Sequence, residues 1–309
     1  MTLKEKLEPL LLKVQKPARY IGGELNSVMK DKNKVETRVA LCFPDNYEIG
    51  MSHLGLKILY SLINERKDCW AERVYAPWID FEALMRENEI PLYGLESLDP
   101  LTDFDVVGFS LQYELSYTNI LNMLDLGGIE PLACDRDNDA PLIIAGGPCA
   151  MNPEPLADFI DLFQIGEGEE VMLEMIDLLQ QHKKAGWDKR AFLREAAQIP
   201  GIYVPSLYDV AYDETGVITS VTPKDGAPEK VTKRIIKDMD KVFYPETFIV
   251  PYTETVHDRA VLEVMRGCIR GCRFCQAGFI YRPIRAKTPD TLCRQGKSLC
   301  DTTGYDEMS

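Results

Sequence analysis

Arg38-Val-Ala-Leu-Cys-Phe43, which runs directly into Pro44-Asp45, is a short apolar segment closed by turn residues. Its length and its almost continuous apolar character are typical of a strand that is buried on both faces of a parallel sheet. The segment that follows, 52–63, has helical periodicity, and Ser52 is its expected N-cap. This strand and this helix begin a pattern that the chain then repeats.

The same alternation continues to residue 182. We expect further strands at 73–77, 105–110, 141–145 and 161–165, and further helices at 81–89, 116–126 and 169–182. Short apolar strands that alternate with amphipathic helices predict an α/β fold, an open, doubly wound parallel sheet of the flavodoxin or Rossmann type. Ligands of such sheets bind at the carboxyl ends of the strands.

Glycines and polar residues follow several of these strands. Asp45, Tyr47 and Gly50 follow the first strand, Ser110 ends the third, and Gly146 and Gly147 follow the fourth. Glycine lets a ligand approach the backbone closely, although a glycine at a strand end is also explained by a tight turn. The sequence therefore predicts an α/β domain over 36–185 with a candidate ligand site at this edge of the sheet.

The segments on either side of this domain differ from it. Residues 1–35 have the pattern of an amphipathic helix and a polar connection, and 186–255 that of a hairpin, with turn residues at 213–216, and a linker. In the last segment, 256–309, the apolar stretch 259–265 is strand-like and is followed by a cysteine-rich loop. A helix then begins at Thr288-Pro-Asp290 and runs to about Cys300, before the entry to another strand.

Cys268, Cys272 and Cys275 form a C-x3-C-x2-C run in that loop. Three thiolates this close together on a glycine-broken loop can hold three irons of a [4Fe–4S] cluster and leave the fourth iron without a protein ligand. An iron that is open in this way can bind and reduce a substrate or a cofactor.

The cysteines could also serve in a structural zinc site or in disulfides. A structural zinc site normally takes four ligands, so zinc would need His257 as the fourth. Cys293 and Cys300, seven residues apart on the expected helix, are interpreted as small core residues. Nine cysteines in 309 residues, with no signal peptide or apolar span of membrane length, do not form the disulfide framework of a small secreted protein. We therefore expect a reducing cytoplasm.

The cysteine spacing, with Phe274 directly before the third cysteine, resembles that of the radical S-adenosylmethionine (SAM) enzymes. The strand-end glycines resemble the cobalamin (B12)-binding domain that precedes the barrel in many of them. Lys16-Pro-Ala-Arg-Tyr20, Phe43-Pro-Asp-Asn-Tyr-Glu-Ile-Gly50 and Arg266-Gly-Cys268 resemble an uncharacterised radical-SAM family with such a domain. Residues 256–309 would then be the start of a partial (β/α) barrel. About five further βα units are needed to complete one, so we expect a fragment of a longer protein that is inactive alone.

The resemblance implies a mechanism for the intact protein. Cys268, Cys272 and Cys275 would ligate the [4Fe–4S] cluster, and SAM would chelate its open iron. One electron, from a donor such as flavodoxin or ferredoxin, would then cleave SAM to methionine and a 5′-deoxyadenosyl radical. Gly267 and Gly271 would let the loop fold around the cluster, and Phe274 would lie beside the adenosine. The substrate, small or macromolecular, is not implied.

The resemblance departs from the cobalamin signature at one position. Asp45 and Gly50 have the spacing of that signature, but Tyr47 stands where its histidine belongs. His53 is close by, and its helical setting indicates a packing or capping role. Cobalamin, held near Ser110, Gly146 and Gly147, therefore remains a possible cofactor.

The charge of the chain limits its partners. A net charge of −14 does not indicate nucleic-acid binding, which needs a cationic surface. Cations nevertheless flank the cysteines, as a basic rim for an anionic substrate or as an ordinary solvated face: Arg259, Arg266, Arg270, Arg273, Arg282, Arg285 and Lys287. Two other classes stay open, a non-catalytic cobalamin- or nucleotide-binding module with a vestigial cluster loop and a structural zinc protein.

Overall fold

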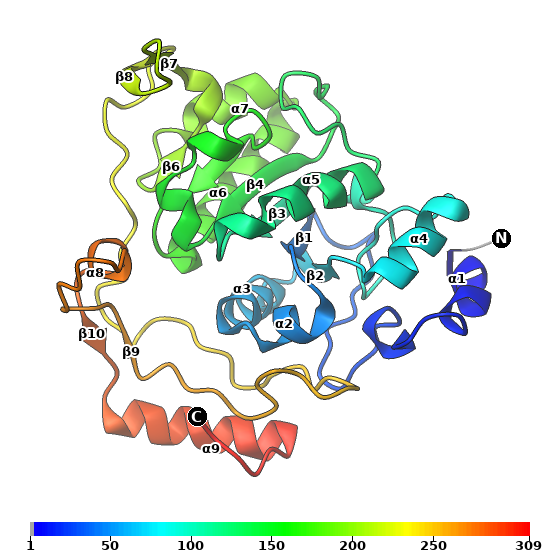
Figure 1. The fold of residues 1–309 in the computed structure, drawn as a ribbon. Coiled ribbons are helices and arrows are strands. Elements are labelled where there is room, and N and C mark those ends of the chain that lie inside the picture. Colours follow the sequence, from blue (N-terminus) through cyan, green and yellow to red (C-terminus); the bar gives the residue numbers. More distant parts are fainter. Residues whose placement is uncertain (1–2) are drawn as a thin grey trace.

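A six-stranded sheet lies at the centre of the protein in a computed structural model, which describes residues 3–309 (Figure 1). The strands are β1 (Thr37–Phe43), β2 (Cys69–Tyr75), β3 (Val106–Ser110), β4 (Leu142–Gly146), β5 (Leu162–Gln164) and β6 (Ile202–Tyr203). Their order is β2-β1-β3-β4-β5-β6; the first five are parallel, and β6 is antiparallel to β5. The order of the parallel strands is that of flavodoxin-like sheets, so the predicted α/β fold is confirmed.

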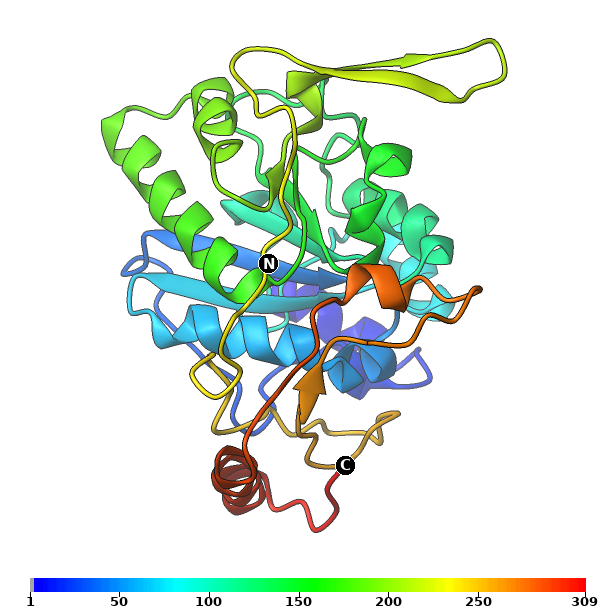
Figure 2. The same cartoon turned by 90° about the vertical axis from the view of Figure 1, so that its left-hand side faces the viewer.

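Helices cover both faces of this sheet (Figures 1 and 2). On one face α3 (Leu54–Glu65) packs beside α6 (Gly168–Ala185), and Arg66 at the end of α3 pairs with Asp177. On the other face α4 (Ile79–Glu87) lies beside α5 (Tyr117–Leu126), joined by the Arg86–Asp125 ion pair. The remaining helices of the domain are α1 (Leu3–Leu11), α2 (Tyr47–Ser52) and α7 (Lys189–Ala196). None of the helices within residues 3–309 is long and apolar enough to span a bilayer.

The edge strand β2 begins four residues earlier than the sequence predicted, because its charged residues are buried as ion pairs. Glu72 accepts a hydrogen bond from Arg38 at 2.6 Å, and Arg73 pairs with both Glu24 and Glu96 at 2.7 Å. Such charges are tolerated inside a protein only when they are partnered. Charged residues at 72 and 73 interrupted the apolar pattern, so the strand was predicted too short.

The N-terminal connection covers this edge of the sheet. Trp70 of β2 donates a hydrogen bond to the carbonyl oxygen of Val28, and Leu25 pairs with Val250 across an isolated antiparallel bridge. The side-chain amide of Asn26 donates to the carbonyl oxygens of Phe248 (3.0 Å) and Thr302 (3.1 Å). The connection is therefore held by residues from the far end of the chain.

The region 186–255 is only partly the predicted hairpin and linker. β7 (Tyr208–Tyr212) and β8 (Ile218–Pro223) pair around the predicted turn and project from the domain (Figure 2). Residues 202–204, which the alternation assigned to the same hairpin region, instead supply β6 of the main sheet. Buried residues of α7 and β6 join the core of the α/β domain, which thus extends beyond residue 185.

The C-terminal segment contains β9 (Met265–Arg266), α8 (Ala277–Ile280), β10 (Arg285–Ala286) and α9 (Pro289–Thr303). Thr288 caps α9 as predicted, and β9 and β10 form a short antiparallel pair. Ala260 bridges Met308 in parallel, through hydrogen bonds from Ala260 N–H to Glu307 and from Ser309 N–H to Ala260. Residues 260–309 therefore form an extended segment, a helix and a second extended segment that lies parallel to the first. The predicted strand 259–265 is a regular strand only where it reaches β9.

Candidate functional site

A cavity of about 320 Å³ lies between the carboxyl edge of the sheet and the cysteine-bearing segment. The ends of β3, β4 and β5 form one wall, and the first turns of α3 and α6 form the second. The third wall consists of Glu263, Arg266 and Tyr281, which flank the cysteine loop. A volume of this size holds a nucleotide-sized group.

Three of the residues predicted for a ligand site lie at this cavity. Ser110, Gly146 and Gly147 all line it. Gly147 has φ +114°, and a Cβ there would lie 2.6 Å from the carbonyl oxygen of Leu111. The backbone itself therefore requires glycine at 147, which agrees with the tight turn and does not depend on a ligand.

The structure does not bring the other three residues of this set to the cavity. Asp45 accepts a hydrogen bond from the Tyr113 hydroxyl at 2.5 Å. Tyr47 is buried and donates its hydroxyl hydrogen to Glu24 at 2.8 Å. Gly50 packs against the ring of Tyr75. Tyr47, at the position of the signature histidine, therefore faces Glu24, which is paired with Arg73 of the edge strand β2.

His53 lines the cavity and was not among the predicted site residues. It is the N-cap of α3, where its Nδ1 accepts a hydrogen bond from Leu56 N–H at 3.1 Å, so the predicted capping role is confirmed and the cap expected at Ser52 is wrong. Burial lowers the pKa of His53 to about 4, against a weaker opposing effect of Gln112. The imidazole is therefore neutral at pH 7, and its Nε2 carries the hydrogen.

The three cysteines of the C-x3-C-x2-C run are free thiols on the loop between β9 and α8. Cys268 and Cys275 are half-buried and Cys272 is exposed. Backbone hydrogen bonds join Cys268 N–H to Tyr281 and Cys275 N–H to Cys272. Three unpaired thiols of this kind are the donor set that an iron–sulfur cluster needs, with one thiolate for each of three irons.

Neither the three cysteines nor other side chains of the described residues form a ready-made site for a single metal ion at the loop. Within residues 3–309 no group of three or more His, Cys, Asp and Glu side chains lies close enough to hold a single metal ion. Cys300 packs against the small apolar cluster under α9, as predicted, but Cys293 is exposed and the prediction of a core role for it is wrong. His257 is exposed and bonds Ser52 through its backbone N–H.

Gly267 and Gly271 differ in their surroundings. Gly267 has φ +111°, and a Cβ there would lie 2.5 Å from the carbonyl oxygen of Pro283, where the two arms of the loop cross. A Cβ on Gly271 would meet open space. Phe274 is 93% exposed, so its ring is free to contact a planar group.

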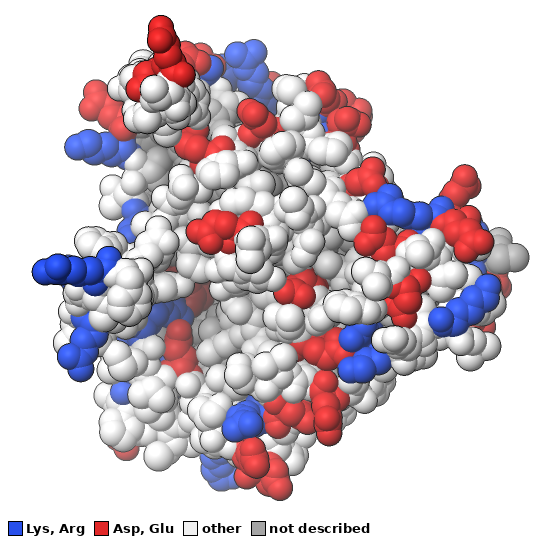
Figure 3. Space-filling view, viewed as in Figure 1, with Lys and Arg blue, Asp and Glu red and all other residues white. Residues whose placement is uncertain are grey.

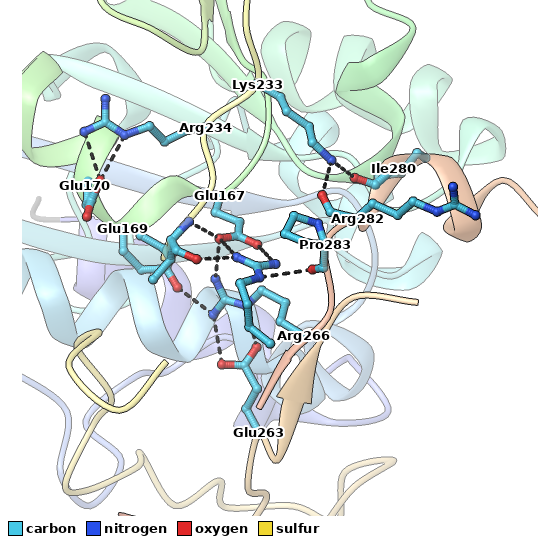
Figure 4. A network of polar contacts seen from close by, with 12 residues as sticks. Glu167, Glu169, Glu170, Lys233, Arg234, Glu263, Arg266, Ile280, Arg282 and Pro283 are labelled. Carbon is cyan, nitrogen blue, oxygen red and sulfur yellow. Dashed lines mark hydrogen bonds and ion pairs between the residues drawn. The ribbon is translucent and has the colours of Figure 1, made fainter. Parts of the chain in front are cut away.

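Two of the seven cations of the predicted basic rim, Arg266 and Arg285, are neutralised by glutamates, and Figure 4 shows the network around Arg266. Arg266 donates to Glu263 through two bonds of 2.8 Å and to Glu169 at 2.7 Å, and Glu167 lies 3.6 Å away. Burial raises the pKa of Glu167, but hydrogen bonds from Arg285 and Ile236 N–H and the charge of Arg266 outweigh it, so the pKa lies below its usual value. The Glu167 carboxylate is therefore ionised at neutral pH.

The remaining cations divide into paired and free groups. Lys287 lies 4.0 Å from Glu263 and 3.7 Å from the centre of the Tyr244 ring, and Arg259 lies 3.6 Å from Glu307. The side chains of three exposed arginines form no ion pair or hydrogen bond with any other described residue: Arg270, Arg273 and Arg282. Figure 3 shows Lys and Arg at the left-hand edge, over this segment, and many Asp and Glu elsewhere.

Comparisons with known proteins bear on this architecture. Residues 55–205 match the family model described as radical SAM proteins, N-terminal. An uncharacterized protein of Methanocaldococcus jannaschii is 27% identical over 263 residues, which cover 84% of this chain and 45% of that protein. A similar structure is that of the radical S-adenosylmethionine methyltransferase TsrM from Kitasatospora setae, with its tryptophan substrate and a SAM analogue bound. It has a TM-score of 0.49 and 15% identity, and covers 88% of this chain and 47% of TsrM. The chain thus spans about half the length of both proteins.

Proposed function

We propose that this chain belongs to a radical-SAM enzyme and that Cys268, Cys272 and Cys275 hold its [4Fe–4S] cluster. The observation that carries the proposal is a run of three free thiols at C-x3-C-x2-C spacing, on a loop whose flanking residues Arg266 and Tyr281 line the cavity of a domain that matches the radical-SAM N-terminal model. When bound, the cluster and SAM supply the one-electron cleavage of the sulfonium bond that yields a 5′-deoxyadenosyl radical. SAM cleavage, substrate and electron donor are proposed for the whole protein.

The residues of this chain would hold and orient these groups. The thiolates would bind iron, and the loop that carries them begins and ends at residues of the cavity wall, Arg266 and Tyr281. Phe274 provides an exposed ring beside the third cysteine for the adenine of SAM. Apolar residues of α3 on the opposite wall, such as Leu54 and Ile58, limit the access of water.

The cavity supports cobalamin as a second cofactor only in part. Ser110, Gly146 and Gly147 are placed for a ligand at the sheet edge, and Tyr47 offers no imidazole there. About 320 Å³ suits the nucleotide tail of such a cofactor and is too small for its macrocycle, which would lie outside the cavity. A titration with hydroxocobalamin, followed by absorbance, tests this proposal, and no binding at millimolar cofactor would exclude it.

Anaerobic reconstitution of the chain with iron and sulfide tests the cluster. We expect about four irons and four sulfides per chain and a brown protein that absorbs near 400 nm. Replacing Cys272 with Ala should lower the iron content strongly, because two thiolates hold the cube poorly. The control is Cys293→Ala, which removes an exposed cysteine of α9 and should leave the iron content unchanged.

Three results would contradict the proposal. A colourless chain that binds one zinc ion would favour the structural zinc alternative. A chain that binds cobalamin or a nucleotide but no iron would favour a binding module with a vestigial loop. Equal iron content in the Cys272 and Cys293 variants would show that the C-x3-C-x2-C run is not the cluster site.

A further inference from the structure

The two arms of the cysteine loop meet at a pair of arginines. β9 and β10 are antiparallel, and Arg266 lies directly opposite Arg285 in their register. Like charges that face each other across an antiparallel pair are destabilising. Two residue pairs of sheet are also too few to be stable alone. Glu263 of the same segment pairs with Arg266 but not with Arg285, so the loop that starts at Gly267 needs a further contribution to stay closed at its base.

Two glutamates of the α/β domain provide that contribution. Glu167 accepts hydrogen bonds from both Nη atoms of Arg285, at 2.8 and 2.7 Å, and from Ile236 N–H at 2.5 Å, and it lies 3.6 Å from Arg266. Glu169 accepts from Arg266 at 2.7 Å. All four side chains are at most 15% exposed, so these contacts are only weakly screened by solvent. We call this group, Glu167, Glu169, Arg266 and Arg285, the glutamate clamp.

Neighbouring glutamates do not take part in the clamp. Glu170 and Glu174, on the same helix, both pair with Arg234 of the linker (Figure 4 shows Glu170). Arg234 lies beside Gly166 in a parallel bridge, and its partners are about half exposed. Helix α6 therefore carries two carboxylate pairs of equal charge, and only one of them reaches the cysteine loop.

We propose that Glu167 and Glu169 are positioning residues for the cluster loop. Glu167 contacts both arginines and Glu169 holds Arg266, so that together they close the base of the loop and fix Cys268, two residues beyond Arg266. The same turn, Gly166 to Glu169, lines the cavity. One structural unit of the α/β domain thus sets both the cavity wall and the geometry of the first cysteine. The proposal rests on the proposed function only for the role of Cys268 as a cluster ligand.

Thiol labelling of the metal-free chain tests the clamp without any cluster. The test variant is Glu167→Gln/Glu169→Gln, and the matched control is Glu170→Gln/Glu174→Gln, which removes the same charge. In the test variant iodoacetamide should label Cys268 about tenfold faster, equivalent to about 1.4 kcal/mol of loop closure. Labelling of Cys272 and of the remote, exposed Cys134 should not change, and the control should match the wild type.

Buried Cys42 and Cys69 report whether the variant remains folded. If they also react faster, the single variant Glu169→Gln, which keeps Glu167 between the two arginines, replaces the double variant. Wild-type labelling of Cys268 in a folded variant would overturn the proposal, as would an equal acceleration in the Glu170/Glu174 control.

The electron paramagnetic resonance spectrum of the reduced, reconstituted chain provides a second readout. The spectrum of the clamp variant in the presence of SAM should differ from that of the wild type, and the control spectrum should superimpose on it. A merely structural role would lower the unfolding temperature and leave the spectrum of the folded protein unchanged. If neither the wild type nor any variant takes up iron, the proposed function is wrong. The labelling rates then still show whether Glu167 and Glu169 position the loop. If all spectra and labelling rates agree, the clamp fails alone.

Discussion

At the scale of single residues, the two glycines of the cysteine loop differ: the backbone requires glycine at 267 and does not require it at 271. Gly267 combines φ +111° with contact between the two arms, whereas Gly271 has an ordinary φ and open space around its Cα. We expect Gly267→Ala to open the base of the loop, because the new Cβ would lie 2.5 Å from the Pro283 oxygen and 2.7 Å from that of Tyr281. Strain of about 1–3 kcal/mol adds to this clash.

The measurement is the iron content after reconstitution, together with the unfolding temperature. Gly267→Ala should bind less iron than the wild type, and Gly271→Ala should bind the same amount. If both substitutions lower the iron content equally, the cause is a general change in loop flexibility, and the close approach of the two arms at Gly267 does not explain it.

At the scale of elements, the cap of α3 depends on pH. The Nδ1 of His53 accepts the Leu56 N–H, and a protonated imidazole cannot accept this bond. The pKa of His53 is about 4 in the fold, lowered mainly by burial, against 6.5 for an ordinary histidine. Below pH 6.5 the unfolded chain therefore binds a proton that the folded chain does not bind until about pH 4. Stability should fall across this window, by up to about 1.4 kcal/mol per pH unit.

His53→Asn isolates this effect, because asparagine caps a helix and does not titrate. Urea unfolding of both proteins between pH 4 and 8 measures it. The free energy of unfolding of the variant, relative to the wild type, should rise as the pH falls below 6.5 and stay constant above 7. Parallel curves over the whole range would assign the acid sensitivity to other groups.

Elements were predicted well where the apolar pattern was continuous. β1, β3, β4 and β5 and their helices follow the predicted ranges, because buried parallel strands are apolar on both faces. β2 was predicted too short, since Glu72 and Arg73 pair with residues distant in sequence, and β6 was assigned to the hairpin region, since two residues carry no period. The cysteine run was found from spacing alone. His53, Glu167 and Glu169 were missed as site residues, because their roles depend on which elements meet at the sheet edge.

At the scale of the whole molecule, charge is distributed unevenly. The chain carries a net charge of −14, yet no Asp or Glu occurs between Glu263 and Asp290. Because the clamp and Glu263 neutralise Arg266, Arg285 and Lys287, the unpaired arginines leave the surface around the cysteines positive. Such a surface favours the approach of an acidic electron-donor protein.

Reduction of the proposed cluster by a flavodoxin, the kind of donor proposed for the whole protein, should therefore depend on these arginines. At low salt we expect Arg270→Gln/Arg273→Gln to slow it about tenfold, since steering by charge contributes at least this much to association. Stopped-flow absorbance near 400 nm measures the rate. Reduction by dithionite should be unaffected, and Arg190→Gln/Arg294→Gln, which removes two exposed arginines outside the cysteine loop, is the control. Equal slowing in both variants would indicate an effect of net charge and no docking surface.

The long-range hydrogen bonds of Asn26 have a consequence for the order of events during synthesis. Its partner Thr302 lies 276 residues further along the chain. At about 5–20 residues per second, a ribosome needs on the order of 14–55 s to add that stretch. The contacts of Asn26 with Phe248 and Thr302 are therefore among the last of the fold to form. Until then the connection is held by residues that emerge early, through the bonds of Lys30 to the carbonyl oxygens of Asn64, Arg66 and Cys69.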